Sequence, residues 1–468
     1  MKYFGLDYGT TNSLLYAYNG GVLEEISITS SAVICQNGAV VKWGTNAWKE
    51  PDPNVGFVES PKQGVDYLDN GVNGVTYRKM IETLLYQMLE GKMEPGSQIT
   101  LTIPNGYSAK NYFDMYEIMS DCLVKLLGQN HQISIHLLPE PVAAALFYVH
   151  KHFKNMPDDS RLVVCDIGGG TTDLCIVELK KSEQKLTFRV VKGMQHDVEL
   201  GGNDFDKKIK ENISEFPKLR LNQEKNLINY IKCSLSESEQ FDGTFNGCRV
   251  RLSRGEFEQF IGDELDRLKG LMKKMLEESG MSVDDNNWYL LPIGGSCRIP
   301  AIRDLLNEVL PKAHQTCQDE KNIFDSVAQG AAIYSAWRAG DLKIGDYNEI
   351  EIKHRYPHEV RFQTADEQWL TIVPKNAPDG KYPSDDKPNV QLVDINIRGD
   401  KYWVGDIYLK EGTLAPLVRT HTKEHGFSLH RRKKEEIKLQ LGVEIKECRL
   451  VKTWLRDCLT KEEQEWTI

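Results

Sequence analysis

Short runs of strand-forming residues predict several β-strands near the N-terminus. SLLYAY, a turn at Asn19-Gly20-Gly21 and VLEEISI predict a hairpin, and SAVICQ and AVVKWG predict two more strands. Farther along, QITLTIP is another predicted strand. ISIHLLPE is also a predicted strand, and it leads into the helical stretch PVAAALFYVHK, which has Pro141 near its first turn.

Apolar residues also recur at helical spacing. In residues 76–91 they share one face, and Gly91 is suited to end that helix. A second helix is expected to begin at Ser108, which serves as its N-cap, and to end near Gly128. Further helical patterns cover residues 203–216, 222–236, 254–280, 299–310 and 324–340. Strands that alternate with helices in this way predict an α/β fold.

The pattern changes after about residue 340. Strands at EVRF, WLTIV, VQLVDINI, YWVGDIYL and ECRLVKTW are separated by Gly, Pro and Asp turns, and helical periodicity largely disappears. We therefore expect an α/β domain over residues 1–340, a linker at 341–350 and a smaller β-rich domain over 351–468.

The composition is that of a soluble globular protein, with 40% hydrophobic and 27% charged residues among 468. A net charge of −10 and a pI near 5.7 leave no basic excess for phosphate backbones, so nucleic acid is not an expected partner. No apolar stretch reaches the ~18 residues of a membrane span, so no membrane association is expected. The first predicted strand begins by Tyr3, which leaves no room for a signal peptide.

The ten cysteines are scattered, with no C-x-x-C pair and no Cys/His cluster at zinc spacing. Cys35, Cys122, Cys165 and Cys175 have apolar neighbours, among which cysteine acts as a small hydrophobic residue. We therefore expect mostly buried, reduced thiols and a cytoplasmic protein.

Two segments share an unusual pattern, GLDYGTTNSLLYA near the N-terminus and VCDIGGGTTDLCIV much later. Each is an apolar strand that ends in Asp, then a turn with Gly, two threonines and a second strand. Neither is a P-loop, because no G-x-x-x-x-G-K-[ST] occurs in the chain and no helix follows either turn directly. Glycine frees the backbone N–H groups at a hairpin tip to form an anion-binding concavity, and threonine hydroxyls add donors.

Two such hairpins that face each other could hold the phosphate chain of a nucleotide from both sides. Aspartates beside a triphosphate require an intervening cation, and Mg²⁺ prefers one or two carboxylates together with water and phosphate oxygens. Asp7 and Asp166 are the candidates. A single hairpin of this kind would also suit an ordinary turn, but the repeat favours a nucleotide-phosphate site between two related α/β lobes.

These residues resemble the actin-like ATPases, which include the hexokinase-type sugar kinases, and most of all the 70-kDa heat-shock protein (DnaK-like) family. Within residues 1–340 the family's motifs appear in order: LPEPVAAALFY is similar to its connecting segment, ELGGNDFD to its G-G-x-D-F-D segment, LPIGGSCRIPAI to its adenosine-binding segment and VAQGAAIYSA to its closing helix. The resemblance implies a duplicated, two-lobed actin-like ATPase domain that binds ATP or ADP with Mg²⁺.

The resemblance also implies roles for individual residues. It implies that Asp7, Glu140 and Asp166 hold Mg²⁺ through water. It further implies that Asp166 or Asp173 orients the attacking water, because positioning accounts for most of the catalysis of phosphoryl transfer. A lysine should reach the terminal phosphate; Lys62 is the candidate, with an ordinary loop lysine as the alternative. The implied cofactor-binding residues are Gly9, Thr10, Thr11, Asn12, Gly168, Gly169, Gly170, Thr171, Gly201, Gly202, Asp204, Lys232, Ser236, Gly294, Gly295, Ser296 and Arg298.

Some positions differ from the family's pattern. The adenine-facing helix usually reads E-x-x-K-R-x-L-S, and here NYIKCSLS has Asn229 in place of the acid and Cys233 in place of the arginine. Phe324 stands where the family usually has an aspartate. These differences bear on adenosine affinity more than on phosphate chemistry.

After residue 350 the resemblance is weaker. WLTIVPKNAPDGKYPS and VQLVDINIRGDKYWVGDIYLKEG are similar to segments of the family's peptide-binding β-sandwich, and an unrelated small β-domain is the alternative. The family's acidic-aliphatic linker is not visible in GDLKIGDYNEIEIKH. No long helical lid is expected after the β-region, so a bound peptide should exchange quickly.

The leading hypothesis is an ATP-binding, ATP-hydrolysing chaperone-like protein. Its two lobes would close on Mg-ATP and bias a small β-domain that binds a polypeptide client, with a co-chaperone or exchange factor as a further candidate partner. The alternatives are a nucleotide-binding partner or scaffold protein with little hydrolysis, a small-molecule kinase on the same fold and an actin-like filament protein. The appended β-domain and the absence of a recognisable sugar-binding loop argue against the kinase.

Overall fold

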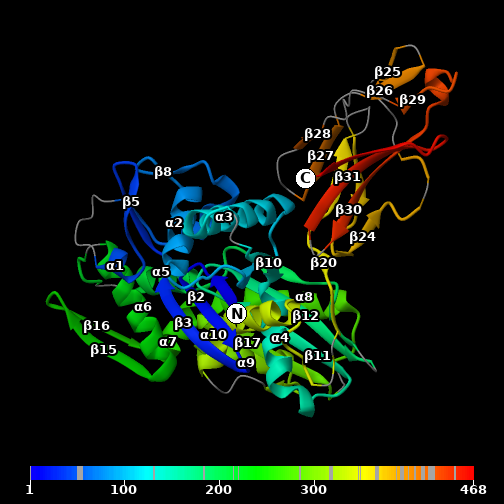
Figure 1. The fold of residues 1–468 in the computed structure, drawn as a ribbon. Coiled ribbons are helices and arrows are strands. Elements are labelled where there is room, and N and C mark those ends of the chain that lie inside the picture. Colours follow the sequence, from blue (N-terminus) through cyan, green and yellow to red (C-terminus); the bar gives the residue numbers. More distant parts are fainter. Residues whose placement is uncertain are drawn as a thin grey trace. The chain divides into compact units, whose positions relative to one another are not determined.

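The chain forms two compact units in the computed structural model (Figure 1). The first comprises Met1–Asn105 and Phe113–Glu351, and the second comprises Gly106–Tyr112 and Ile352–Ile468. The structure describes residues 2–49, 56–129, 132–182, 185–213, 216–219, 221–283, 286–315, 320–345, 347, 349–363, 368–385, 387–389, 395–398, 400–404, 407–412, 417–419, 427–446 and 449–467.

The first unit contains a five-stranded sheet built around the first glycine hairpin. β1 (Tyr3–Tyr8) and β2 (Asn12–Asn19) are the antiparallel strands of that hairpin, and β3 (Val22–Ser30) is antiparallel to β2. β9 (Gln98–Ile103) runs parallel to β1, and β10 (Ser134–Pro139) runs parallel to β9. The strand order is therefore β10-β9-β1-β2-β3.

A second sheet in the same unit repeats this arrangement. β11 (Asp159–Ile167) and β12 (Thr172–Lys181) form the second glycine hairpin, and β13 (Lys185–Val190) is antiparallel to β12. β17 (Trp288–Ile293) runs parallel to β11, and β18 (His314–Gln315) runs parallel to β17. Both sheets share one strand order and one set of strand directions, so the predicted duplicated α/β fold is confirmed.

Two further strands extend the second sheet. β14 (Gln195–Asp197) pairs with β12, and β19 (Glu349–Lys353) lies next to β13. β19 begins inside the stretch 341–350 that the sequence suggested as a linker, so the last residues of that stretch belong to the sheet.

One helix from each half packs on the sheet of the other half. α4 (Glu140–His152) follows β10 and packs on β11 and β12, whereas α10 (Glu320–Arg338) packs on β1, β2 and β9. The two helices also pack against each other, and a Cβ atom on Gly330 would overlap the Ala143 carbonyl oxygen. Because each helix crosses to the opposite sheet, the two halves form one body around this helix pair.

The helices outside this pair largely follow the expected periodicity. α2 (Tyr77–Leu89) is capped by Thr76, whose hydroxyl accepts the Lys79 N–H, and Gly91 follows with φ 70°. α3 (Ala109–Leu127) has the predicted cap, since the Asn111 N–H donates to Ser108 Oγ at 3.1 Å. The other predicted helices include α6 (Leu221–Glu237) and α9 (Pro300–Val309).

Two helical expectations differ from the structure. Residues 254–280 form two helices, α7 (Arg254–Phe260) and α8 (Gly262–Ser279), because Ile261 leaves the helical conformation at φ −94°, ψ 13° and its side chain is fully buried. α5 (Gly202–Asn212) ends before residue 216. Smaller elements of the first unit are β4 (Val33–Gln36), β5 (Ala39–Trp43), β6 (Gly56–Val58), β7 (Gly71–Val72), β8 (Val75–Thr76), β15 (Gln240–Phe245), β16 (Cys248–Ser253), α1 (Thr45–Trp48) and the 3₁₀ segments Pro61–Tyr67, Phe153–Asn155 and Gly295–Arg298.

The second unit is rich in β-strands, as expected. One four-stranded sheet has the order β22-β21-β27-β28 and another has the order β24-β30-β31-β32. Buried side chains from both sheets, including Phe362, Leu409, Val443 and Leu455, belong to one hydrophobic cluster. Its strands are β20 (Arg355–Tyr356), β21 (Val360–Gln363), β22 (Trp369–Val373), β23 (Ala377–Pro378), β24 (Gly380–Tyr382), β25 (Ile395–Arg398), β26 (Lys401–Val404), β27 (Ile407–Glu411), β28 (Leu417–Arg419), β29 (Phe427–Ser428), β30 (Leu439–Lys446), β31 (Arg449–Asp457) and β32 (Glu463–Thr467).

One predicted strand of this unit is wrong in extent. YWVGDIYL contributes to two strands, β26 and β27, which belong to different sheets. The expected strand VQLVDINI is described only as β25, because residues 390–394 lie outside the described part of the chain.

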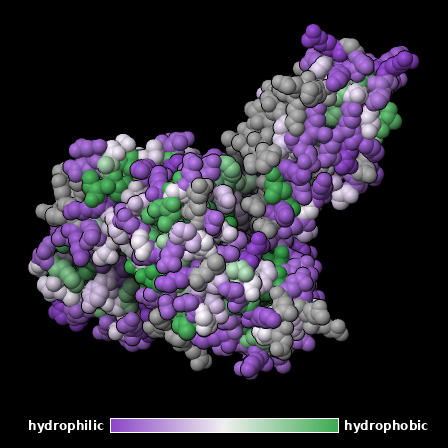
Figure 2. All heavy atoms as spheres, in the orientation of Figure 1, coloured by the Kyte–Doolittle hydropathy of each residue, from purple (hydrophilic) through white to green (hydrophobic). Residues whose placement is uncertain are grey.

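The surface carries both hydrophilic and hydrophobic residues, and the four thiols that the sequence singled out are buried. No helix within the described ranges is both long and apolar enough to cross a membrane. Figure 2 shows hydrophilic residues over much of the visible face, with hydrophobic residues between them. Cys35, Cys122, Cys165 and Cys175 are free and buried, as their apolar neighbours predicted.

Candidate functional site

A cavity of about 690 Å³ in the first unit is lined by the tips of both glycine hairpins. Residues that are far apart in the sequence meet there, and they come from both halves of the duplicated unit. Of the residues that the sequence singled out, the cavity is lined by Asp7, Gly9, Thr10, Thr11, Asn12, Lys62, Glu140, Asp166, Gly168, Gly169, Thr171, Gly202, Lys232, Ser236, Gly294, Gly295, Ser296 and Arg298.

The two hairpin tips lie directly against each other. A Cβ atom on Gly169 would overlap Thr11 Oγ1, and one on Gly170 would lie 2.8 Å from Thr10 Cγ2. A Cβ atom at either position would therefore force a threonine side chain of the first tip to move, so glycine favours this close approach. On the first tip, Ser31 Oγ donates to the Gly9 carbonyl oxygen at 2.7 Å, and this hydrogen bond stabilises the turn.

The Gly201-Gly202 segment packs on the second tip and starts α5. The Gly202 N–H donates to the Gly168 carbonyl oxygen at 3.0 Å, and the Asn203 N–H donates to the Gly169 carbonyl oxygen at 2.6 Å. A Cβ atom on Gly201 would lie 2.9 Å from the Gly170 carbonyl carbon. Gly170 and Gly201 are not among the residues that line the cavity, so the structure gives them a role in packing the tip.

A cluster of carboxylates surrounds one buried lysine. Lys62 Nζ lies 2.8 Å from Glu140 Oε1, and each side chain is 9% exposed. Burial raises the pKa of Asp7, and it raises the pKa of Glu140 to about 7, with Lys62 opposing both shifts. Burial, followed by repulsion from Glu140 and Asp173, holds the pKa of Asp166 well above its usual range. The acids outnumber the one lysine, so a cation would relieve their repulsion.

Asp173 belongs to this cluster but does not line the cavity. It stands opposite Asp166 in the β11–β12 pair and is only 1% exposed. Its Oδ1 accepts a hydrogen bond from His196 Nδ1 at 2.9 Å. Asp166 is therefore the acid of this pair that can touch a ligand in the cavity directly.

Helix α6 forms another wall of the cavity. Lys232 Nζ donates to the Gly202 carbonyl oxygen at 3.0 Å and lies 2.8 Å from Asp206 Oδ1. Ser236 Oγ donates to the Lys232 carbonyl oxygen at 3.1 Å. The sequence singled out Asp204, but that side chain pairs with Lys207 outside the cavity lining, and Asp206 takes the place at the cavity.

The turn after β17 completes the site. Gly294 has φ 82°, and a Cβ atom there would lie 2.5 Å from the Ile167 carbonyl oxygen and 2.8 Å from Asp166 Oδ1. Ser296 Oγ donates to the Gly168 carbonyl oxygen at 2.8 Å, which joins this turn to the second hairpin tip. At Gly295 a Cβ atom would meet nothing within 4 Å, so it would point into open space.

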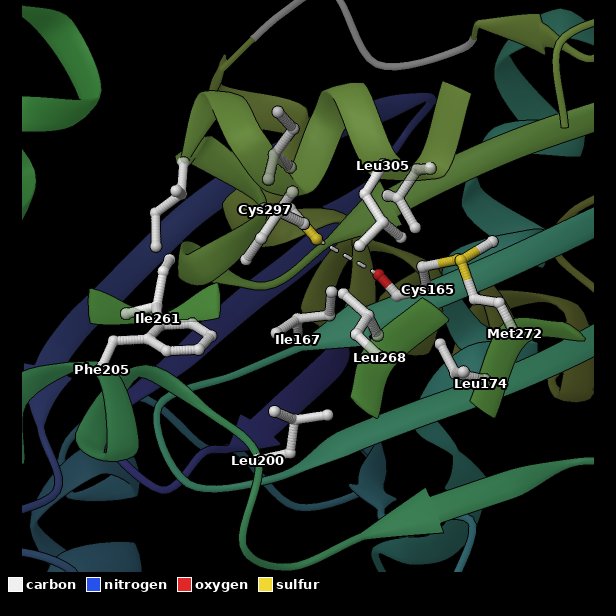
Figure 3. Packing of buried hydrophobic residues seen from close by; sticks show 14 of the residues in the cluster. Cys165, Ile167, Leu174, Leu200, Phe205, Ile261, Leu268, Met272, Cys297 and Leu305 are labelled. Atoms are coloured by element: carbon white, nitrogen blue, oxygen red, sulfur yellow. Dashed lines mark hydrogen bonds between the residues drawn. The ribbon is translucent and has the colours of Figure 1, made fainter. Parts of the chain in front are cut away.

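A hydrophobic core lies behind these two turns and anchors them (Figure 3). Cys165 directly precedes Asp166, and Cys297 directly follows Ser296. The Cys297 thiol donates to the Cys165 carbonyl oxygen at 3.4 Å, and both side chains are fully buried. Figure 3 shows this pair among packed side chains that include Leu174, Leu268, Met272 and Leu305.

The sequence interpretation missed several residues that line the cavity. Glu59 and Lys225 form an ion pair there. The polar residues of α6 recur at helical spacing, and that periodicity was a usable signal for a ligand-facing side of the helix. The missed residues that line the cavity are Leu14, Ser30, Thr45, Trp48, Lys49, Glu59, Asn203, Asp206, Lys225, Asn226, Glu237, Ile299 and Arg303; Asn229, Cys233 and Phe324, which depart from the resemblance, line it as well.

The donor set fits a hydrated cation accompanied by phosphate. In the part of the chain that the structure describes, no three His, Cys, Asp or Glu side chains are grouped closely enough to hold a metal ion by themselves. Mg²⁺ typically takes one or two carboxylates and completes its shell with water and substrate phosphates. Asp7, Glu140 and Asp166 beside the Cβ-free hairpin tips are suited to that arrangement.

Comparison with known families identifies the relatives of this chain. The model of the family described as Hsp70 protein matches residues 133–396, which are 264 of the 468 residues. The chain belongs to the Hsp70 family. The matched range contains the second hairpin, α4, α6 and the Gly294 turn. The first hairpin lies outside that range, and its likeness to the second rests on the shared sequence pattern and the shared strand order.

Family membership explains the architecture and gives the general class of function. The duplicated α/β unit is the actin-like ATPase fold of the Hsp70 family. Members of this chaperone family are ATPases that generally bind ATP or ADP with Mg²⁺. They also generally bind polypeptide clients and co-chaperones.

Proposed function

We propose that this Hsp70-family chain binds ATP and ADP with Mg²⁺ in the cavity between its two hairpin tips and hydrolyses ATP there. The observation that carries the proposal is the close contact of the tips at Gly169 and Thr11 beside the carboxylate cluster. Two anion-binding turns and a group of acids that needs a cation share one cavity, and a magnesium-bound polyphosphate supplies both partners.

The residues of the two tips would hold the phosphates. Backbone N–H groups and hydroxyls at Gly9, Thr10, Thr11 and Asn12 would donate from one side, and those at Gly169 and Thr171 would donate from the other. Gly168 lines the same side, but its N–H donates to the Thr171 carbonyl oxygen at 2.9 Å and closes the turn. Lys62, held in place by Glu140, supplies positive charge for the terminal phosphate.

The acids would prepare the cavity for the metal and for water. Asp7, Glu140 and Asp166 would hold Mg²⁺ through water molecules, and the metal would neutralise charge on the phosphates. Asp166 lines the cavity whereas Asp173 lies behind it, so Asp166 is the better candidate to orient the attacking water.

The other end of the cavity would bind the nucleoside. Gly294, Gly295 and Ser296 allow the base and ribose close to the backbone, and the Arg298 guanidinium can stack on adenine. Lys232 and Ser236 on α6 form the facing wall.

Calorimetric titration with Mg-ATP and Mg-ADP tests the proposal directly. Uptake of either nucleotide is expected, and Asp166→Asn should weaken binding of Mg-ATP by about tenfold or more, since it removes a charged group from the metal site. Asp158→Asn, at a carboxylate that is 79% exposed, is the matched control and should bind normally. If neither ATP nor ADP binds to the wild-type protein, the proposal is wrong.

Thiol labelling offers a readout that does not depend on hydrolysis. Cys233 is exposed and lines the cavity, whereas Cys248 and Cys458 are partly exposed and are not among the cavity residues. Saturating Mg-ADP should slow alkylation of Cys233 by about tenfold or more, as a bound ligand excludes the reagent. Peptide mapping by mass spectrometry should show unchanged labelling at Cys248 and Cys458. Equal labelling of Cys233 with and without nucleotide would contradict the assignment.

A nucleotide-binding partner or scaffold with little hydrolysis is the second candidate. Asn229 and Cys233 favour it, because they replace charged family residues at the cavity wall and so alter the nucleoside end. A single-turnover assay with labelled ATP separates the two, since the scaffold would bind ATP and leave it intact. Phosphate transfer to a sugar in the same assay would instead indicate a small-molecule kinase.

We further propose that the second unit binds a polypeptide client in a nucleotide-dependent way, with a co-chaperone or exchange factor as an additional partner. The support is family membership together with the shared core of its two sheets. Fluorescence anisotropy of a labelled unfolded peptide should change when ATP replaces ADP. The buried, free thiols support a reducing compartment, the cytoplasm, as the location.

A further inference from the structure

His196 lies at the edge of the carboxylate cluster, and neither the motifs nor the cavity lining gives it a role. It is the middle residue of β14, which pairs antiparallel with β12. In that register His196 stands opposite Asp173, and Asp173 stands opposite Asp166 in the β11–β12 pair. The two pairings place Asp166, Asp173 and His196 in one row across three strands.

The contact between His196 and Asp173 is direct and sheltered. His196 Nδ1 lies 2.9 Å from Asp173 Oδ1, and the Asp173 side chain is 2% exposed. The His196 side chain is 29% exposed, so the ring can exchange protons with solvent. A carboxylate in this geometry accepts the Nδ1–H, which fixes both its own rotamer and the tautomer of the ring.

Three acids act electrostatically on His196. They are Asp173 on β12, Glu140 on α4 and Asp197 on β14. Asp197 is already paired, because Arg267 Nε lies 2.7 Å from its Oδ2. The charge of Asp173 raises the pKa of His196 above its usual value, and burial of the ring opposes that rise.

We propose that His196 is a positioning residue for ATP hydrolysis: its Nδ1–H holds Asp173 in one orientation, and its positive charge balances that acid. The inference rests on the proposed function. Asp173 is one of the acids that repel Asp166, and Asp166 lines the cavity. Balancing the charge of Asp173 weakens this repulsion, so that Asp166 is a better acceptor for a metal-bound or attacking water.

The test compares His196→Ala, His196→Asn and wild type in kcat, KM and nucleotide Kd. Alanine removes both the hydrogen-bond donor and the positive charge. The kcat should fall about tenfold, because one charge-assisted hydrogen bond is lost. The Kd of Mg-ADP should stay within about twofold of the wild-type value, because this hydrogen bond is remote from the ligand. Asparagine keeps a neutral donor near the position of Nδ1 and should restore part of kcat. His314→Ala, at an exposed histidine outside the cavity lining, is the matched control.

The pH profile gives a readout that a merely structural role would not move. The ring is charged below its raised pKa and neutral above it, so wild-type kcat should fall as the pH rises through that value. His196→Asn has no such titration, and this alkaline decrease should be absent from its profile. Ring NMR should also show a lower His196 pKa in Asp173→Asn than in wild type.

The outcomes separate this inference from the proposed function. If wild type binds no nucleotide, the proposed function fails. If wild type hydrolyses ATP and His196→Ala matches it in kcat and pH profile, only the role of His196 is overturned. Binding without turnover in wild type also overturns that role and leaves the nucleotide cavity standing. Loss of nucleotide affinity in His196→Asn in proportion to kcat would indicate a structural role instead.

Discussion

Glu140 is a residue whose charge depends on its place in the fold. Burial raises its pKa to about 7, and Lys62 opposes the shift. An unfolded glutamate ionises near ~4.3, so the folded state keeps a proton that the unfolded state loses as the pH rises from there to about 7. Folding stability is therefore lost across this window, by on the order of 3 kcal/mol once the pH exceeds the folded pKa.

Glu140→Gln removes this cost, because glutamine does not ionise and its carbonyl can still accept from Lys62. The ligand-free variant should unfold at a higher temperature than wild type at pH 8, and the difference should shrink as the pH falls and vanish below about pH 4, where the unfolded carboxyl is also protonated. Scanning calorimetry without nucleotide measures both. Glu277→Gln, on the exposed surface of α8, should show no such trend. Equal stability of Glu140→Gln and wild type at pH 8 would show that Glu140 ionises without penalty.

Other residues of the site show why only part of it could be predicted from the sequence. The hairpin residues could be found because strand, acid, glycine and threonine are adjacent in the chain. Asp206 was missed in favour of Asp204, since two positions on a helix point in nearly opposite directions and only packing sets which one faces the cavity. His196 was missed because it lies far from Asp173 in the sequence, and only the pairing register of β12 and β14 places the two residues opposite each other.

At the scale of elements, the crossing of α4 and α10 depends on a small residue, Gly330. A Cβ atom on Gly330 would overlap the Ala143 carbonyl oxygen, and backbone cannot move aside as a side chain can. Gly330→Ala should therefore destabilise the protein by about 1–3 kcal/mol through overpacking, despite the higher helix propensity of alanine. Thermal unfolding of the ligand-free protein measures the change.

Gly270 in α8 is the matched control for this prediction. A Cβ atom there would meet nothing within 4 Å, and the residue is exposed. Gly270→Ala should gain about 0.5–1 kcal/mol from helix propensity alone, so the two substitutions should have opposite signs. A stabilised Gly330→Ala variant would mean that the helices can separate without cost.

The elements themselves were largely predictable, and their exceptions have one cause. Helices such as α2 and α3 can be predicted from an apolar face and a capping residue, because both signals are local in the sequence. The break at Ile261 and the division of YWVGDIYL between two sheets are not local, because a buried side chain or a distant partner strand decides them. Periodicity gave the type of each element, and tertiary packing gave these boundaries.

At the scale of the whole first unit, the duplication leads to a specific expectation about nucleotide binding. The repeated motif predicted two related halves, and the matching strand orders agree with it. Each half supplies one hairpin tip to the cavity, so a ligand held by phosphate contacts on both sides should order both tips together.

Hydrogen–deuterium exchange tests whether nucleotide orders both hairpin tips together. Mg-ADP should slow exchange at peptides that contain 9–12 and at peptides that contain 168–171, and the slowing should have the same dependence on nucleotide concentration, since one binding event orders both tips. The hairpin β15–β16, which is not part of the cavity lining, should exchange equally fast with and without nucleotide. Protection of one tip alone would mean that the ligand rests on a single half, and the duplicated hairpin would then need another explanation.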